Sequence, residues 1–196
     1  LPDGYQGPSS EHFLSLGEIN TLLSAFSGLG TSKVRLTGGE PTLRRDFLDI
    51  LSATANTPGI KRVAMTTHGG RMAEHAAAWK QAGLHQVNVS IDSLDPRQFA
   101  AITGQDKLKQ VLAGLDAAVE AGLDVKVNSV LLNDFSDARL NRFLDWLKTM
   151  PVTLRFIELM ETGDTTHFFK AQHQGGTPLK QTLIDAGWQP MVRRKD

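Results

Sequence analysis

The residues best suited to chemistry are Gly38, Gly39, Glu40 and Pro41, which directly follow the short run KVRLT at 33–37. Glycines expose backbone N–H and C=O groups and let a ligand approach the main chain closely. Glu40 supplies a carboxylate that can accept from an ammonium group, and Pro41 restricts the exit of the turn. The pattern indicates a ligand-binding turn, and a purely structural strand-to-helix turn is the alternative.

Polar side chains also occupy every second position of four strand-like runs, in alternation with apolar ones. They are Arg35, Thr37, Thr66, Asn88, Ser90, Asp92, Lys126 and Asn128. Alternate residues of a strand point to opposite faces, so the pattern places these side chains on one face of a sheet. Two cations there, Arg35 and Lys126, favour an anionic ligand, because an unpaired buried charge costs several kcal/mol. The alternative is that Arg35 pairs with Asp92 while Lys126 extends to the rim.

The elements that must position these residues alternate between strands and amphipathic helices. Strands are predicted at 33–37, 61–67, 86–92, 124–132 and 152–159, with an edge strand at 188–194. Helices are predicted at 17–29, 44–56, 71–83, 95–104, 107–122, 138–150 and 177–187, and a polar loop carries His167 and His173. This alternation predicts parallel βαβ units in an α/β fold. A doubly wound sheet needs two apolar faces, so one polar face favours a (β/α) barrel with helices outside only.

Composition narrows the class of protein further. The 196 residues suit a single domain, 1–196, and equal totals of 21 Lys+Arg and 21 Asp+Glu predict no nucleic-acid partner. No apolar run is long enough to cross a bilayer, so we expect no membrane contact and a cytoplasmic location. With no cysteine, these residues form no disulfide and offer no thiolate to a metal.

Five segments together resemble the radical S-adenosylmethionine (SAM) enzymes, and within them the GTP 3',8-cyclases of molybdenum cofactor biosynthesis. They are VRLTGGEPTLRRDF, TTHGGRM, VNVSIDSLDPRQFAAITGQDKL, VKVNSVLL and LRFIELMETG, in an order that spans essentially the whole chain. The resemblance implies a partial (β/α) TIM-like barrel and a 4Fe-4S cluster that cleaves SAM to a 5′-deoxyadenosyl radical. It also implies hydrogen abstraction from GTP, and a product that a downstream cyclic pyranopterin monophosphate synthase consumes. Assembly of the protein as a homodimer is left as an open alternative.

The resemblance also implies roles for single residues in holding SAM. Gly39 would contact the methionine part of the cofactor, with Gly38 and Glu40 beside it. Ser90 would hold the ribose region, and Met160 would pack on the adenine.

For GTP, the resemblance implies contacts from Arg35, Thr66, Lys126 and Arg155. Arg35, Thr66 and Lys126 are also among the residues that the alternation of polar and apolar positions places on the polar face of the sheet. Arg155 and Met160 have opposite parity, so both face inward only if the strand bulges or ends between them.

The absence of cysteine needs an explanation, because the resemblance implies two 4Fe-4S clusters. The cysteines of the first would stand immediately before LPDGY at 1–5, and those of the second beyond Asp196. The first barrel strand would also lie upstream. We therefore expect a central core that lacks the C-terminal cluster-binding segment, holds no metal and is inactive alone, since these clusters need thiolates. A further departure is His68, where the family pattern TTNG has Asn.

Two alternatives of different classes remain at this point. One is a catalytically degenerate module that binds SAM or a nucleotide without chemistry. The other is a phosphate-binding barrel aldolase or isomerase, in which Lys126 would form a Schiff base.

Overall fold

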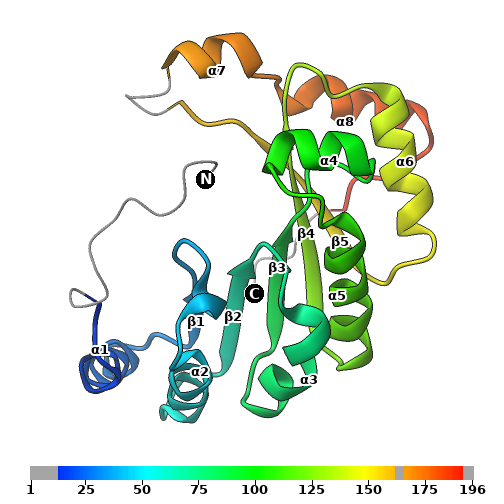
Figure 1. Ribbon diagram of the computed structural model, residues 1–196. Helices are drawn as coiled ribbons and strands as arrows, with labels where there is room; N and C mark the ends of the chain where they lie inside the picture. The colour runs from blue at the N-terminus through cyan, green and yellow to red at the C-terminus, as the bar shows by residue number, and fades with distance from the viewer. Residues whose placement is uncertain (1–12, 162–165, 192–196) are drawn as a thin grey trace.

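Five parallel strands form a single sheet in the order β1-β2-β3-β4-β5 (Figure 1). The computed structural model describes residues 13–161 and 166–191. The strands are β1 (Lys33–Leu36), β2 (Arg62–Thr67), β3 (Gln86–Ser90), β4 (Asp124–Leu131) and β5 (Thr153–Glu158). Neighbours in the sheet are also neighbours in the sequence, so every connection is a crossover of the βαβ type.

Helices occupy the connections between strands and the two ends of the described chain. They are α1 (Leu16–Gly28), α2 (Phe47–Asn56), α3 (Met72–Gln81), α4 (Pro96–Thr103), α5 (Leu108–Glu120), α6 (Asp137–Leu147), α7 (Thr166–Gln172) and α8 (Gly176–Asp185), with a short 3-10 helix, η2 (Pro41–Leu43). Each predicted helix is confirmed within a few residues.

One face of the sheet is apolar and buried beneath helices. Strand residues of one parity, such as Val63, Met65 and Val89, belong to a continuous core with residues of α2, α3, α5 and α6. Trp79 of α3 meets Phe47 of α2 edge-on, with ring centroids 5.9 Å apart. Because helices bury only this face, the opposite face is left for polar side chains, as the alternation predicted.

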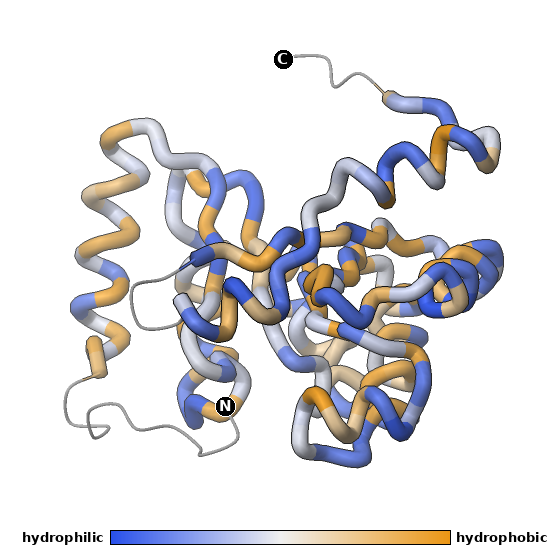
Figure 2. The backbone as a smooth tube through the Cα atoms, turned by 90° about the horizontal axis from the view of Figure 1, so that it is seen from above, coloured by the Kyte–Doolittle hydropathy of each residue, from blue (hydrophilic) through white to orange (hydrophobic). Residues whose placement is uncertain are grey.

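Within the described residues the sheet is open, because β1 and β5 each pair with a single neighbouring strand. In the two views the first helix, α1, stands at one side of the molecule and α8 at the other (Figures 1 and 2). Orange and blue alternate along α1 in Figure 2, and its apolar Leu22 and Phe26 are exposed. A partial barrel is therefore confirmed as the fold class.

Two local predictions are corrected. The polar loop expected to carry His167 and His173 is in part helix α7, which includes His167 and ends at Gln172. His173 directly follows the helix, and its ring centroid lies 4.5 Å from that of Phe169 in α7. The edge strand expected at 188–194 does not form over 188–191, and 192–194 lies outside the described residues. Pro190 lacks the N–H that a strand donates, which disfavours pairing there.

Within 13–161 and 166–191, no helix combines the length and apolarity that crossing a membrane requires.

Candidate functional site

The uncovered face of the sheet carries polar side chains in rows that the strand register aligns. Thr66 pairs with Asn88, which pairs with Lys126. One layer nearer the carboxyl ends of the strands, Ser90 pairs with Asn128, which pairs with Arg155. Register therefore confirms that these predicted side chains share one face, and it places Arg155 on that face too. Met160 follows the end of β5, which removes the conflict of parity.

A hydrogen-bond network crosses this face around Asn88, which is fully buried. Asn88 Oδ1 accepts from Gln86 Nε2 at 2.8 Å and from Arg155 Nη2 at 3.0 Å. Asn88 Nδ2 donates to Thr66 Oγ1 at 3.4 Å. The network holds side chains of three strands in place, and Gln86 is a member that the sequence argument missed although it shares their parity.

Two buried polar atoms on the same face have no partner within the described residues: Asn128 Oδ1 and Arg155 Nε. They belong to neighbouring residues of β4 and β5. Leaving such groups unpaired costs about 1–3 kcal/mol each, and more for a charged group. A polar, anionic ligand would suit this pair, because it can accept from Arg155 Nε and donate to Asn128 Oδ1.

Positive charge is concentrated toward the amino ends of the strands. Partial desolvation, then the charges of Arg62, Arg35 and Lys126, lower the pKa of Lys33, and Asp124 opposes this effect. Lys126 Nζ lies 3.7 Å from Asp124 Oδ2, and Arg62 donates to the same carboxylate. The positively charged side chains here, Lys33, Arg35, Arg62 and Lys126, therefore outnumber the nearby acid, Asp124. Lys33 was missed by the sequence argument, although it stands two positions before Arg35.

The side chain of Arg35 is exposed and makes no hydrogen bond or ion pair with any described residue. The alternative in which it pairs with Asp92 is wrong. Asp92 Oδ1 instead accepts from the backbone N–H of Val130 at 2.7 Å, because Asp92 lies beyond the end of β3.

The Gly38–Pro41 turn follows the carboxyl end of β1. A Cβ on Gly38 or Gly39 would meet no atom within 4 Å. No hydrogen bond engages the backbone of either glycine within the described chain. Free N–H and C=O groups with open space around them form a suitable cradle for a polar ligand. A cavity of about 520 Å³ adjoins the turn on the side of α1 and α2.

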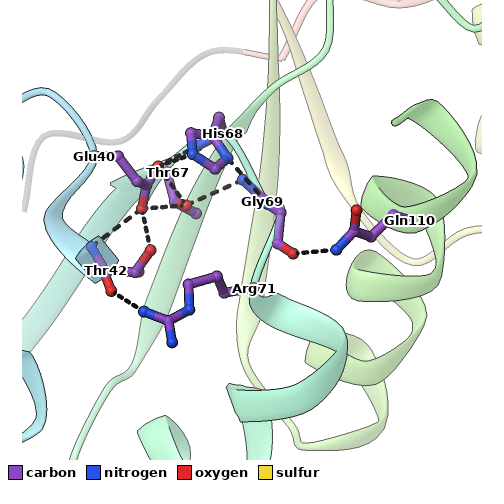
Figure 3. Close-up of polar contacts among 8 residues, drawn as sticks. Glu40, Thr42, Thr67, His68, Gly69, Arg71 and Gln110 are labelled. Atoms are coloured by element: carbon purple, nitrogen blue, oxygen red, sulfur yellow. Dashed lines mark hydrogen bonds and ion pairs between the residues drawn. The ribbon is translucent and has the colours of Figure 1, made fainter. Parts of the chain in front are cut away.

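Glu40 has a different environment from its glycine neighbours. Its side chain is only 6% exposed. The carboxylate accepts from Thr42 N–H at 3.2 Å, from Thr67 Oγ1 at 2.9 Å and from His68 N–H at 2.8 Å (Figure 3). These contacts attach the turn to the end of β2. That Glu40 also accepts a hydrogen bond from the ammonium group of a ligand stays a prediction.

The two ring nitrogens of His68 lie near groups that an asparagine amide could also contact. Its Nδ1 accepts from Gly70 N–H at 3.1 Å, and its Nε2 lies 3.3 Å from Glu40 Oε2. An asparagine has one acceptor oxygen and one donor nitrogen at its tip. The geometry is therefore compatible with the Asn of the related sequence pattern.

The remaining predicted cofactor residues are accessible. Ser90 is exposed at the carboxyl end of β3, and Met160 is 77% exposed after β5. Both stand at the edge of the sheet where parallel strands end, as does the Gly38–Pro41 turn.

The carboxyl of Asp92 gives the site a pH dependence that can be tested. Burial raises its pKa, and the hydrogen bond from Val130 N–H and the charge of Arg139 oppose the rise. The folded protein thus holds this proton more tightly than the unfolded chain, and stability falls as pH rises from the ordinary carboxyl range through the raised pKa. We expect Asp92→Asn to be more stable than the unmodified protein at neutral pH, with a gap that narrows on acidification.

Thermal unfolding of both proteins between about pH 2 and pH 7 measures this gap. Asp95→Asn is the matched control of opposite sign, because hydrogen bonds from Arg142 and then Gln98 lower the pKa of Asp95. The charged Asp95 carboxylate stabilises the fold above the ordinary carboxyl pKa. Asp95→Asn should therefore be less stable than the unmodified protein at neutral pH and equally stable in acid. A gap for Asp92→Asn that does not change with pH would contradict the assignment.

The chain contains no cysteine, so it offers no thiolate for an iron–sulfur cluster. Among the described residues, no group of three or more His, Asp or Glu side chains is placed to hold a metal ion. The residues thus fit a small organic ligand with charged groups, and they do not by themselves fit a cluster.

Comparison with known proteins places the chain among relatives. The model of the Radical SAM superfamily matches residues 4–147. A GTP 3',8-cyclase of Shewanella denitrificans is 58% identical over 96% of this chain and 56% of its own length. A GTP 3',8-cyclase of Yersinia pestis is 53% identical over the whole chain and 60% of its own length. The chain therefore spans less than two thirds of these curated relatives.

Among solved structures, Streptococcus suis SuiB bound to S-adenosylmethionine superposes with a TM-score of 0.75. The match covers 94% of this chain and 41% of SuiB at 15% identity, so it supports the fold alone.

Proposed function

Because the chain belongs to the Radical SAM superfamily, we propose that it is the core of a GTP 3',8-cyclase that binds SAM and GTP on the uncovered face of its sheet. The specific activity is supported by 58% and 53% identity to proteins of that name. Since the chain spans only part of those relatives, the activity, the substrate and the need for further segments are all parts of this proposal.

The observation that supports the substrate is the pair of unsatisfied buried atoms on the face that also carries the cations Lys126 and Arg35. Arg155 Nε and Asn128 Oδ1 lack partners, and Lys126 lies one layer below them on the same face. A nucleoside triphosphate offers phosphate oxygens to Arg155, Lys126 and Arg35, and a purine edge or ribose hydroxyl to Asn128 and Thr66. GTP suits this donor set better than an apolar or cationic substrate does.

SAM would be held at the adjoining carboxyl ends of β1, β3 and β5. The free backbone groups of Gly38 and Gly39 suit its aminocarboxylate end, Ser90 suits a ribose hydroxyl, and exposed Met160 offers an apolar surface to the adenine. When SAM is bound together with a cluster, it supplies the radical chemistry of the superfamily, and this chain's residues orient SAM and GTP toward each other.

The aldolase or isomerase alternative does not agree with membership of the superfamily. A degenerate binding module remains the second candidate function, because this chain has no cysteine to ligate a cluster. The two candidates differ in whether the full-length protein consumes SAM.

The deciding experiment uses the full-length protein that contains these residues, purified without oxygen, reconstituted with iron and sulfide, and assayed with an added one-electron reductant such as dithionite. We expect it to convert SAM to 5′-deoxyadenosine in a GTP-dependent way, with GTP consumed in step. ATP at the same concentration is the control nucleotide. SAM cleavage that ignores GTP would overturn the substrate, and SAM binding without cleavage would favour the degenerate module.

A further inference from the structure

Glu40 is tied to residues of another loop rather than to its own strand. Thr67, the last residue of β2, places its Oγ1 2.9 Å from each carboxylate oxygen of Glu40. The next residue, His68, donates its backbone N–H to the same carboxylate at 2.8 Å. On the side of the turn, Thr42 contributes its N–H and, at 2.5 Å, its hydroxyl. The carboxylate thus joins the turn after β1 to the loop after β2.

A second contact joins the same two segments. Arg71 Nη1 donates to the carbonyl oxygen of Thr42 at 2.6 Å. The loop is anchored in turn to α5, because Gln110 Nε2 donates to the Gly70 carbonyl oxygen at 2.7 Å (Figure 3). We name residues 67–71 the clamp loop.

The clamp loop is fixed in position by close packing. Gly69 has a φ of +85°, and a Cβ there would lie 3.0 Å from side-chain carbons of Val111 and Val89. Only glycine suits both the left-handed backbone and this approach. The loop is therefore a rigid support for whatever it holds.

Thr67 is unusual for its place in the sheet. It has the same parity as Val63 and Met65, whose side chains lie in the apolar core, and it is only 3% exposed. A valine would pack at least as well, and a buried hydroxyl without a partner costs about 1–3 kcal/mol. The Thr67 hydroxyl has partners on both sides, since it donates to Glu40 and accepts from Gly69 N–H at 3.0 Å.

Gly38 and Gly39 depend on this arrangement. Neither glycine is hydrogen-bonded to the described chain, so the turn is held at its two ends, by β1 before it and, after it, by Glu40 together with the Arg71 contact to Thr42. The direction of the glycine N–H and C=O groups then follows from where Glu40 is held. Preorganised groups bind a ligand more tightly because less ordering entropy is lost.

We propose that Thr67 is a positioning residue for SAM: its hydroxyl holds the Glu40 carboxylate so that the Gly38–Gly39 backbone faces the charged aminocarboxylate end of the cofactor. This inference rests on the proposed function for the identity of the ligand. The hydrogen-bonded clamp itself does not depend on that identity.

The test compares Thr67→Val with Thr67→Ser in the full-length, cluster-reconstituted protein. Loss of one hydrogen bond to a charged group corresponds to a loss of about tenfold or more in affinity. We expect Thr67→Val to raise KM and Kd for SAM about tenfold, while kcat at saturating SAM changes less and the GTP affinity is unchanged. Thr67→Ser, which keeps the hydroxyl, should restore SAM affinity.

Thr54→Val is the matched control. Thr54 is fully buried, and its hydroxyl donates within α2 to the Ile50 carbonyl oxygen, so the same chemical change occurs away from the turn. This control should leave SAM affinity unchanged. Thermal unfolding of all variants shows whether each is folded before affinity is compared.

Hydrogen exchange gives a readout without SAM. The amides of Thr42 and His68 donate to Glu40, so they should exchange faster in folded Thr67→Val and normally in Thr67→Ser. Unchanged exchange, equal losses of SAM and GTP affinity, or failure of serine to rescue would each overturn the clamp. If Thr67→Val does not fold, the same comparison uses Thr67→Ala against Thr67→Ser. If the unmodified protein does not bind SAM, the proposed function fails while the exchange result still decides the clamp.

Discussion

Gly39→Val is expected to lower the SAM affinity of the full-length protein about 100-fold or more while the fold is kept, because the added side chain fills the space in which the cofactor would contact the Gly39 backbone. A Cβ on Gly39 meets no protein atom within 4 Å, and its φ is not in the left-handed region. The added side chain therefore clashes only with a ligand that approaches the backbone. Equilibrium binding of SAM, with thermal unfolding of the same sample, measures the two effects.

Gly28→Val provides the control for this substitution. Gly28 ends α1, and a Cβ there also meets nothing within 4 Å, again without a positive φ. Both variants should unfold near the temperature of the unmodified protein, and only Gly39→Val should fail to bind SAM. A Gly39→Val protein with normal SAM affinity would show that the cofactor does not contact this turn.

Lys126→Met is expected to weaken GTP binding about 10- to 100-fold, the usual cost of losing a hydrogen bond between charged groups. The side chain is 26% exposed, and methionine keeps most of its apolar length. Its one ion-pair partner, Asp124, retains Arg62 after the change, so no acid is left unpaired. Loss of affinity should then reflect the lost ammonium rather than a damaged fold.

The measurement is the equilibrium affinity for GTP and, separately, for SAM in the full-length protein. Lys148→Met is the matched control, because Lys148 is 75% exposed on the solvent side beside Asp145. We expect GTP affinity to fall only in Lys126→Met and SAM affinity to stay constant in both. An equal loss of SAM and GTP affinity in Lys126→Met would mean that the substitution disturbs the sheet as a whole.

Strand parity in the sequence predicted which face of the sheet most of the candidate site residues occupy. Alternation alone predicted that Arg35, Thr66 and Lys126 share one face, and the register of the strands confirms it. This succeeded because the side-chain period of a strand is two, independently of what surrounds it. Arg155 needed the structure, since the sequence does not show that β5 ends before Met160.

Other features depended on contacts between residues that are distant in the chain. Thr67 broke the alternation of β2, and only the approach of Glu40 explains its buried hydroxyl. Helix α7 was missed because its seven residues carry too short an apolar pattern to distinguish a helix from a loop.

The sequence by itself determined the βαβ order, the single polar face of the sheet and the glycine turn at the end of its first described strand, because these follow from local periodicity and backbone freedom. Only the tertiary structure decided which polar groups are satisfied and which await a ligand. That distinction depends on distances across the sheet: Glu40 is taken up by Thr67 and His68, whereas Arg155 Nε and Asn128 Oδ1 are left without partners in the described chain.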